Sequence, residues 1–325
     1  MIHYCTSFNE AYLIRGVALY QSLERHSAQP FTLWVLCFDE RSYQIIEQLN
    51  LSNFKPITLA ILEADDPAML VAKSNRTMVE YFFTCSPLFP LYLFKYEPSI
   101  DQITYLDSDL FFFSDPQPIF DEMGTASILI IPHRFPPHLK HLEESGIYNV
   151  GLLSFRKDEN ALACLHWWRE RCLEWCYDRR EDGKFADQKY LDDWTTRFSG
   201  VHVLQHKGAN LAPWNIMNYR IRKEHNRIWV DDHQLIFYHF QGLKLLSRWL
   251  YDPGVYQYST PPSATRQLIY IPYIQALKTA FAFVKNSEID VNPGYSGLFS
   301  RAYGRKTFLF RLTHGQLVFL RQPFI

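Results

Sequence analysis

The feature that most constrains the fold of this chain is an apolar run at residues 103–113, ITYLDSDLFFF, which two aspartates interrupt. A short, continuous apolar stretch is typical of a buried strand in a parallel sheet. The carboxyl ends of such strands are where α/β sheets bind ligands. Two carboxylates there are costly to remove from water unless a positive charge lies between them, and a divalent cation is the simplest candidate. We therefore expect Asp107 and Asp109 to bind a metal ion. A strand-end turn with one capping and one solvated aspartate is the alternative.

Similar apolar segments alternate with helical patterns along the first part of the chain. Strands are predicted at residues 2–8, 31–39, 57–65, 127–135 and 148–156, and helices at 10–26, 41–51, 76–96 and 162–178. This alternation indicates βα units, and hence an α/β fold with a mainly parallel central sheet flanked by helices. After residue 195 the pattern becomes irregular. We expect one catalytic domain at residues 1–250 and a C-terminal extension at 251–325.

Composition excludes several classes of protein. The 325 residues are 47% hydrophobic and carry a formal net charge of -1, which is typical of a folded protein and argues against nucleic-acid binding through bulk phosphate neutralisation. No apolar run reaches the roughly 18 residues of a spanning helix, and the N-terminus does not resemble a signal peptide. The six scattered cysteines lack metal-site spacing, so we expect core thiols in a reducing cytoplasm.

A second informative segment is IFYHFQGLK at residues 236–244. A strand-like run leads to His239, and imidazole is a common metal ligand. Gly242 permits close approach of the backbone, and Lys244 provides a point charge that suits a phosphate. We expect His239 to join the two aspartates around one cation, with Gly242 and Lys244 on a diphosphate that the cation bridges. A buried histidine at an ordinary strand end is the alternative.

Together these segments resemble the retaining nucleotide-sugar glycosyltransferases of the GT-A fold, particularly the family-eight group that contains galactosyltransferases and glycogenin. That group carries a D-x-D motif and a late H-x-x-G-x-K motif, matched here by DSD at 107–109 and HFQGLK at 239–244. The resemblance covers roughly residues 3–244. It implies a GT-A nucleotide-diphospho-sugar transferase fold, a bound Mn²⁺ (or Mg²⁺), and a nucleotide-sugar donor, which we expect to be a UDP-sugar. It also implies that Ser108 lies at the donor.

The N-terminal segment CTSFNEAYL resembles the first strand and loop of the family, which cradle the nucleotide. The resemblance implies that Thr6, Ser7 and Asn9 lie beside the base and ribose, whereas an ordinary strand with an Asn cap is the alternative. Asp39, at the end of the second strand, is a further candidate for donor binding. Arg76 opens the helical region where relatives place a basic residue near the donor.

Two later segments match the part of the family that surrounds the sugar. YNVGLLSF resembles its F-N-x-G stretch, which implies that Asn149 bonds the donor sugar while Gly151 leaves room for it. ADQKYL resembles its D-Q element, which implies that Asp187 binds sugar hydroxyls and that Gln188 lies near the anomeric carbon. A polar helix start is the alternative for that element.

The segment LAPWNIMNY occupies the place of a family segment that borders the acceptor and donor pockets, so Trp214 and Asn215 are candidates there. Two departures stand out. The Pro-Trp that commonly follows the late lysine is Leu245-Leu246 here, and the tail beyond residue 245 has no counterpart that we can align.

Together with the resemblance, these residues predict a metal-dependent transfer of sugar to an acceptor hydroxyl with retention of configuration, and front-side attack if Gln188 lies where the resemblance implies. The acceptor would be a glycan, glycolipid or protein, in the synthesis of bacterial-type surface glycans. A degenerate sugar-nucleotide-binding or scaffold protein is one alternative. An aspartyl-phosphate-type phosphatase is another, although Phe111 stands where its motif has Thr or Val. Nucleotidyl transfer would need a Gly-rich triphosphate loop, which is absent. The oligomeric state is not predicted.

The C-terminal stretch 291–325 contains no acidic residue, and its basic residues alternate with Leu, Phe and Tyr: Arg301, Arg305, Lys306, Arg311 and Arg321. One interpretation is a pair of closing strands with solvated basic residues. The other is a basic, aromatic surface that rests on anionic lipid. The latter would make the protein peripheral at the inner face of a membrane.

Overall fold

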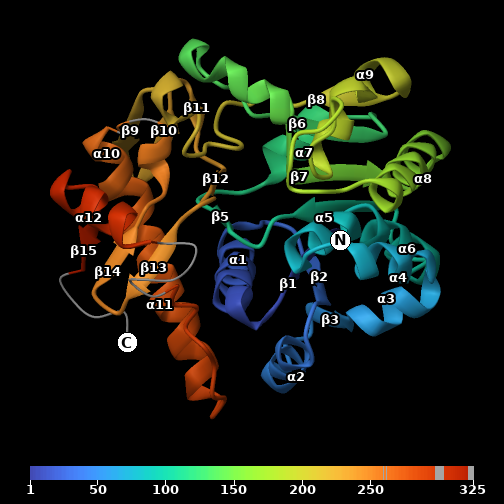
Figure 1. The fold of residues 1–325 in the computed structure, drawn as a ribbon, viewed down its shortest axis with the longest axis horizontal. Coiled ribbons are helices and arrows are strands. Elements are labelled where there is room, and N and C mark those ends of the chain that lie inside the picture. Colours follow the sequence, from blue (N-terminus) through green and yellow to red (C-terminus); the bar gives the residue numbers. More distant parts are fainter. Residues whose placement is uncertain (259, 261, 297–303, 321–325) are drawn as a thin grey trace. The chain divides into compact units, whose positions relative to one another are not determined.

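The computed structural model describes residues 1–258, 260, 262–296 and 304–320. The chain divides into two compact units (Figure 1). Unit 1 comprises Met1–Asn9, His26–Ser108 and Asp115–His206, and unit 2 comprises Glu10–Arg25, Asp109–Ser114 and Lys207–Ile325. These units divide the chain differently from the boundary expected near residue 250. A separate role for residues 251–325 stays a prediction.

Unit 1 is built on one seven-stranded sheet in the order β3-β2-β1-β4-β7-β6-β8. Its strands are β1 (Ile2–Phe8), β2 (Phe31–Cys37), β3 (Phe54–Thr58), β4 (Gln102–Leu106), β6 (Ile128–Pro132), β7 (Tyr148–Arg156) and β8 (Val201–Val203). The pairs β1–β2, β1–β4, β2–β3 and β6–β8 are parallel, whereas β7 runs antiparallel to β4 and β6. The predicted α/β class with a mainly parallel sheet is therefore confirmed.

Side-chain caps mark the start of some helices of unit 1. Asp39 caps α2 through the amide of Ser42, and Thr77 and Glu80 form a capping box at α5.

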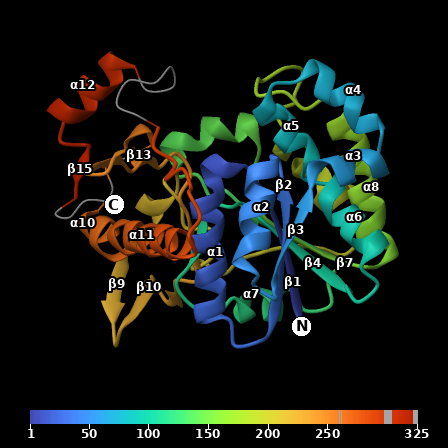
Figure 2. The same ribbon diagram turned by 90° about the horizontal axis from the view of Figure 1, so that it is seen from below.

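Helices α3–α6 and α8 gather together beside the sheet (Figure 2), and they share one apolar core with it around Trp168 and Trp194. The helices are α2 (Glu40–Leu49), α3 (Leu59–Asp65), α4 (Ala68–Asn75), α5 (Met78–Cys85), α6 (Leu88–Tyr96), α7 (Gln117–Met123), α8 (Glu159–Glu174) and α9 (Trp194–Arg197).

The strand predicted at residues 57–65 is wrong. The strand β3 ends at Thr58, and residues 59–65 form helix α3. Leu59 and Leu62 are buried while Ile61 is exposed, which is helical spacing. A short apolar run rich in Leu, Ala and Glu suits either element, and here the helical preference of these residues prevails.

Unit 2 contains helix α1 (Leu13–His26) and the antiparallel pair of β5 (Leu110–Phe112) and β12 (Phe237–His239). The run at 103–113 is thus two strands, β4 and β5, separated by the DSD motif. Among the described residues, the other strands of unit 2 form two small sheets, β9 (Ile221–Glu224), β10 (Arg227–Val230) and β11 (His233–Gln234) in one and β13 (Lys244–Ser247), β14 (Leu250–Asp252) and β15 (Val318–Phe319) in the other. Its further α-helices are α10 (Ser263–Thr265), α11 (Ile271–Asn286) and α12 (Arg305–Thr313).

The interpretation of the C-terminal stretch as two closing strands is wrong for its middle part, because residues 305–313 form helix α12. Arg301 and Arg321 lie outside the described residues. All six cysteines are free and buried, as expected for core thiols. Within the described ranges, every helix is too short or too polar to cross a bilayer.

Candidate metal centre and donor site

The backbone of unit 2 brings Asp109 and His239 together. Asp109 directly precedes β5 and His239 ends β12, and in this antiparallel pair His239 lies opposite Leu110. The amide of Phe240 donates to the carbonyl of Asp109 at 3.0 Å, which extends the pairing by one more bond. As a result, Nε2 of His239 lies 3.2 Å from Oδ1 of Asp109.

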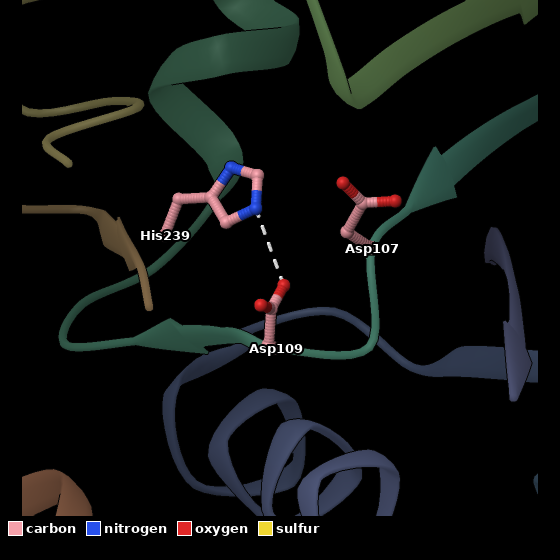
Figure 3. A group of neighbouring side chains, drawn as sticks. All are labelled: Asp107, Asp109 and His239. Carbon is pink, nitrogen blue, oxygen red and sulfur yellow. Dashed lines mark ion pairs between the residues drawn. The ribbon is translucent and has the colours of Figure 1, made fainter. Parts of the chain in front are cut away.

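Asp107 lies at the end of β4, where its amide donates to the carbonyl of Gly151 at 2.9 Å. Its carboxylate accepts a hydrogen bond from the Tyr105 hydroxyl at 3.1 Å. Only Ser108, which is buried, separates it from Asp109 along the chain. One ligand atom from each of Asp107, Asp109 and His239 can be chosen so that all three lie within 4.8 Å of one another (Figure 3).

This donor set fits a divalent cation. Two carboxylates and one imidazole are ligands that Mn²⁺ accepts, and Mg²⁺ is also bound through carboxylates. Burial would raise the pKa of Asp109, but the charges of His239 and Arg15 outweigh it and hold that pKa below its usual range. The carboxylate is therefore ionised at neutral pH, as metal binding requires.

Asn149 and Gly151 lie on β7 beside the DSD motif. The side-chain oxygen of Asn149 accepts from the amide of Gly151 at 3.0 Å, and its nitrogen lies 3.3 Å from Nε2 of His133. Because the carbonyl of Gly151 accepts from Asp107, Asn149 stabilises the backbone next to that aspartate. Contact of Asn149 with a sugar stays a prediction.

Asp187 is only 4% exposed and accepts a hydrogen bond from the Ser86 hydroxyl at 2.7 Å. Burial, together with the charge of Asp107, raises the pKa of Asp187 to about 7. The neighbouring Gln188 donates from Nε2 to the carbonyl of Ser145 at 2.8 Å. Unit 1 thus brings Asp107 and Asp187 close enough for their charges to interact, although 79 residues separate them in the sequence.

The candidates for nucleotide binding fall into two groups. Thr6 is buried on β1, and its hydroxyl finds no hydrogen-bond partner within the described residues, while Ser7 and Asn9 are half-buried. Asp39 caps α2 instead, and Arg76 donates two 3.0 Å bonds to the carbonyls of Cys172 and Leu173 at the end of α8. Asp39 and Arg76 therefore have structural roles. Contact of any of these five candidates with the donor stays a prediction.

The candidates of unit 2 surround the imidazole and the turn that follows it. The ring of Trp214 lies edge-on to His239, with centroids 5.3 Å apart. Asn215 accepts from the amide of Ala212 and donates to the carbonyl of Asn210, both at 2.9 Å, so it holds its own loop together.

Gly242 has φ +79°, a conformation that favours glycine. A methyl group on Gly254 would lie 2.5 Å from the carbonyl oxygen of Gly242, so this turn needs a second glycine. Lys244 begins β13 directly after the turn.

Sequence reasoning missed two residues that support these groups, Arg15 and Ser86. Arg15, on α1, donates to the carbonyl of Leu243 at 3.3 Å and acts electrostatically on Asp109. Ser86 bonds Asp187 across 101 residues of sequence. Neither carries a local signal, because an arginine or a serine in a helical pattern is ordinarily at the surface.

Comparison with known proteins extends these observations. No protein-family model matches the sequence. The uncharacterised protein YfnD of Bacillus subtilis (strain 168) is 32% identical over 296 residues, which are 90% of this chain and 94% of that protein. YfnF of the same strain is 34% identical over 252 residues, 75% of this chain and 82% of that protein.

Two solved structures share the fold. The galactosyltransferase LgtC, in complex with donor and acceptor sugar analogues, matches with a TM-score of 0.50 and 16% identity over 74% of this chain and 87% of its own. The glycosyltransferase GlyE of Streptococcus pneumoniae TIGR4 matches with a TM-score of 0.50 and 14% identity over 88% of this chain and 62% of its own. The chain therefore has the GT-A fold of nucleotide-sugar glycosyltransferases, as predicted, and it belongs to the same family as YfnD and YfnF of Bacillus subtilis.

Proposed function

We propose that this protein is a metal-dependent glycosyltransferase, which moves a sugar from a nucleotide diphosphate sugar to an acceptor hydroxyl. The observation that carries the proposal is the convergence of Asp107, Asp109 and His239 in a chain with the GT-A fold. The likeness to LgtC, whose structure holds donor and acceptor sugar analogues, supports a sugar substrate. We propose a UDP-sugar as the donor.

In this proposal, Asp107, Asp109 and His239 would hold Mn²⁺ or Mg²⁺, which when bound supplies Lewis-acid stabilisation for the departing diphosphate. Lys244 contributes a point charge, and the Gly242 amide a hydrogen bond, to the same phosphates. Thr6, Ser7 and Asn9 contact the nucleotide. Among the described residues the hydroxyl of Thr6, buried on β1, has no hydrogen-bond partner, which is consistent with a polar ligand there.

The sugar is proposed to lie beside Asp187 and Asn149, with Gln188 near the anomeric carbon and Trp214 and Asn215 toward the acceptor. Each of Asp187, Asn149 and Gln188 is fixed by a hydrogen bond, so these groups are pre-oriented before substrate binds. We propose retention of configuration, with the acceptor hydroxyl attacking from the face that the diphosphate leaves. An inverted product in an NMR assignment of the anomer would contradict this part.

We further propose that helix α12 contacts anionic lipid, so that the protein is cytoplasmic and peripheral at the membrane, where it serves surface-glycan synthesis. Phe310 is 53% exposed, with Leu309 and Leu312 exposed beside it. Arg305 and Lys306 are exposed on the same helix, which has no acidic residue. A basic helix with exposed apolar side chains binds lipid through both properties.

A donor screen tests the proposal. Thermal shifts would be measured for a panel of nucleotide sugars with Mn²⁺ and with EDTA, and the stabilising donors would be assayed for sugar transfer and for hydrolysis. We expect one donor to stabilise the protein only with Mn²⁺ and to be turned over. A sugar-nucleotide-binding protein without activity would show the shift without turnover, and a phosphatase would release phosphate from simple phosphate esters instead.

A further inference from the structure

The metal ligands of unit 2 rest on aromatic side chains from the C-terminal part of the chain. Tyr273, on α11, stacks on Phe240 with ring centroids 3.7 Å apart and planes 18° apart. The same ring lies 5.4 Å from Phe111. Phe240 directly follows His239, and Phe111 is two residues beyond Asp109. One side chain of α11 therefore packs against residues that adjoin both Asp109 and His239 in the sequence.

Tyr270 strengthens this contact from the preceding turn of helix. Its ring lies 5.4 Å from Phe240, and its hydroxyl donates to the carbonyl of Pro253 at 3.1 Å. The hydroxyls of Tyr270 and Tyr238 are also 3.1 Å apart, which ties the helix to β12. The side chains of Tyr270 and Tyr238 are both buried, so the position of β12 depends on the position of this helix.

Arg15 supports the other end of the H-x-x-G-x-K segment. It is 8% exposed, and its guanidinium donates to the carbonyl of Leu243 at 3.3 Å and to that of Ala11 at 3.5 Å. Within the described ranges no carboxylate forms an ion pair with it. Burying a guanidinium in this way is costly unless acceptors satisfy its hydrogen bonds, and the carbonyls of Ala11 and Leu243 do so, which ties Arg15 to the turn at 240–244.

The neighbourhood of Arg15 is close-packed. Gly294, with φ +77°, passes so near α1 that a methyl group there would lie 2.8 Å from the carbonyl of Ala11 and 3.6 Å from Nη1 of Arg15. The hydroxyl of Tyr273 is buried and has no hydrogen-bond partner within the described residues. Close-packed side chains thus lie against Phe111, Phe240 and the carbonyl of Leu243.

We propose that Tyr273 and Arg15 are positioning residues, which hold Asp109, His239 and the turn at 240–244 in the arrangement that binds the divalent cation. Helix α11 is then part of the cation site and no separate appendage. The inference rests on the metal site of the proposed function. Groups that orient metal ligands commonly change metal affinity about 10- to 100-fold when they are removed.

The test measures Mn²⁺ affinity of the full chain by the EPR signal of free Mn²⁺, without donor. Tyr273→Leu removes the stacked ring, whereas Tyr273→Phe keeps it. Phe281→Leu is the matched control, since it makes a similar change two turns further along α11. We expect Tyr273→Leu to weaken Mn²⁺ binding about 10-fold or more, and Tyr273→Phe and Phe281→Leu to stay within about twofold of the wild type. Circular dichroism verifies that each variant is folded at the assay temperature.

Arg15→Met gives a second test, because two explanations of the role of Arg15 predict opposite changes in Mn²⁺ affinity. If Arg15 acted only by its charge, removing a cation near Asp109 would tighten Mn²⁺ binding. If it positions the turn, binding weakens about 10-fold, and Arg25→Met, an exposed change on the same helix, has no effect. Unchanged or tighter binding in Arg15→Met, or unchanged binding in Tyr273→Leu, overturns the inference and leaves the proposed function intact. A wild-type chain that does not bind Mn²⁺ overturns both.

Discussion

Replacing Asp187 by Asn should stabilise the protein in a pH-dependent way. The folded protein raises the pKa of this carboxyl to about 7, because the group is buried and Asp107 is nearby, whereas the unfolded chain has the ordinary value of 3.8. Between these two values the folded state holds a proton that the unfolded state has released. The free energy of unfolding of the wild type therefore falls as the pH rises through this window.

The size of the effect follows from the two pKa values. One pKa unit corresponds to about 1.4 kcal/mol, so the ionised carboxylate costs the folded state roughly 4 kcal/mol at pH 8. Asparagine carries no charge and can still accept the hydrogen bond from Ser86. The stability gained by Asp187→Asn should be small at pH 4, grow by about 1.4 kcal/mol per pH unit between pH 4.5 and 6.5, and level off above pH 7.

The assay is urea denaturation from pH 4 to 8 in EDTA, so that no cation offsets the charge of Asp107. Asp182→Asn is the matched control, because Asp182 is exposed and its backbone conformation, φ 50°, suits Asn equally well. We expect this control to follow the wild type at every pH. A difference between Asp187→Asn and the wild type that does not change with pH would refute the reasoning. The stabilised variant should also lose transfer activity, since Asp187 is proposed to bind the sugar.

Three further predictions concern the metal, a turn and the membrane. Asp109→Asn should abolish EDTA-sensitive transfer and leave the far-UV spectrum unchanged, and full activity in this variant would exclude the aspartate as a ligand. Gly254→Ala should destabilise the protein by about 2 kcal/mol more than Gly183→Ala. Both residues have φ near +73°, but only at Gly254 would the added methyl lie 2.5 Å from a carbonyl oxygen, that of Gly242. Equal losses of stability in the two variants would show that Gly254 and Gly242 are not in close contact. Reversing the charges of Arg305 and Lys306 with Glu should reduce flotation with anionic liposomes and leave the weak binding to neutral liposomes unchanged; flotation equal to the wild type would remove the proposed lipid contact.

The sequence predicted those parts of the site that lie on local patterns. The apolar run before Asp107 and the strand before His239 both exist, and the loop and strand ends bring their side chains together. The α/β class followed from the alternation of strands and helices. The strand predicted at 57–65 is wrong because the sequence LAILEAD at residues 59–65, mostly Leu, Ala and Glu, suits a helix as well as it suits a buried strand.

The groups that support the site were not predictable from local patterns. Arg15 lies 228 residues from the carbonyl that it bonds, and Ser86 lies 101 residues from Asp187. Tyr273 looks like one more aromatic residue of an apolar helix, and only the tertiary structure reveals that it stacks beside His239. Such contacts depend on packing between distant segments, which neither spacing nor composition encodes.

The central claim is that Asp107, Asp109 and His239 bind a cation to which the donor diphosphate attaches. Calorimetric titration of UDP into the protein, first with Mn²⁺ and then with EDTA, tests it most directly. We predict that UDP binds the wild type only when Mn²⁺ is present, and that His239→Gln loses this dependence together with most of the affinity. Equal binding of UDP in Mn²⁺ and in EDTA, or unchanged Mn²⁺-dependent binding in His239→Gln, would contradict the account.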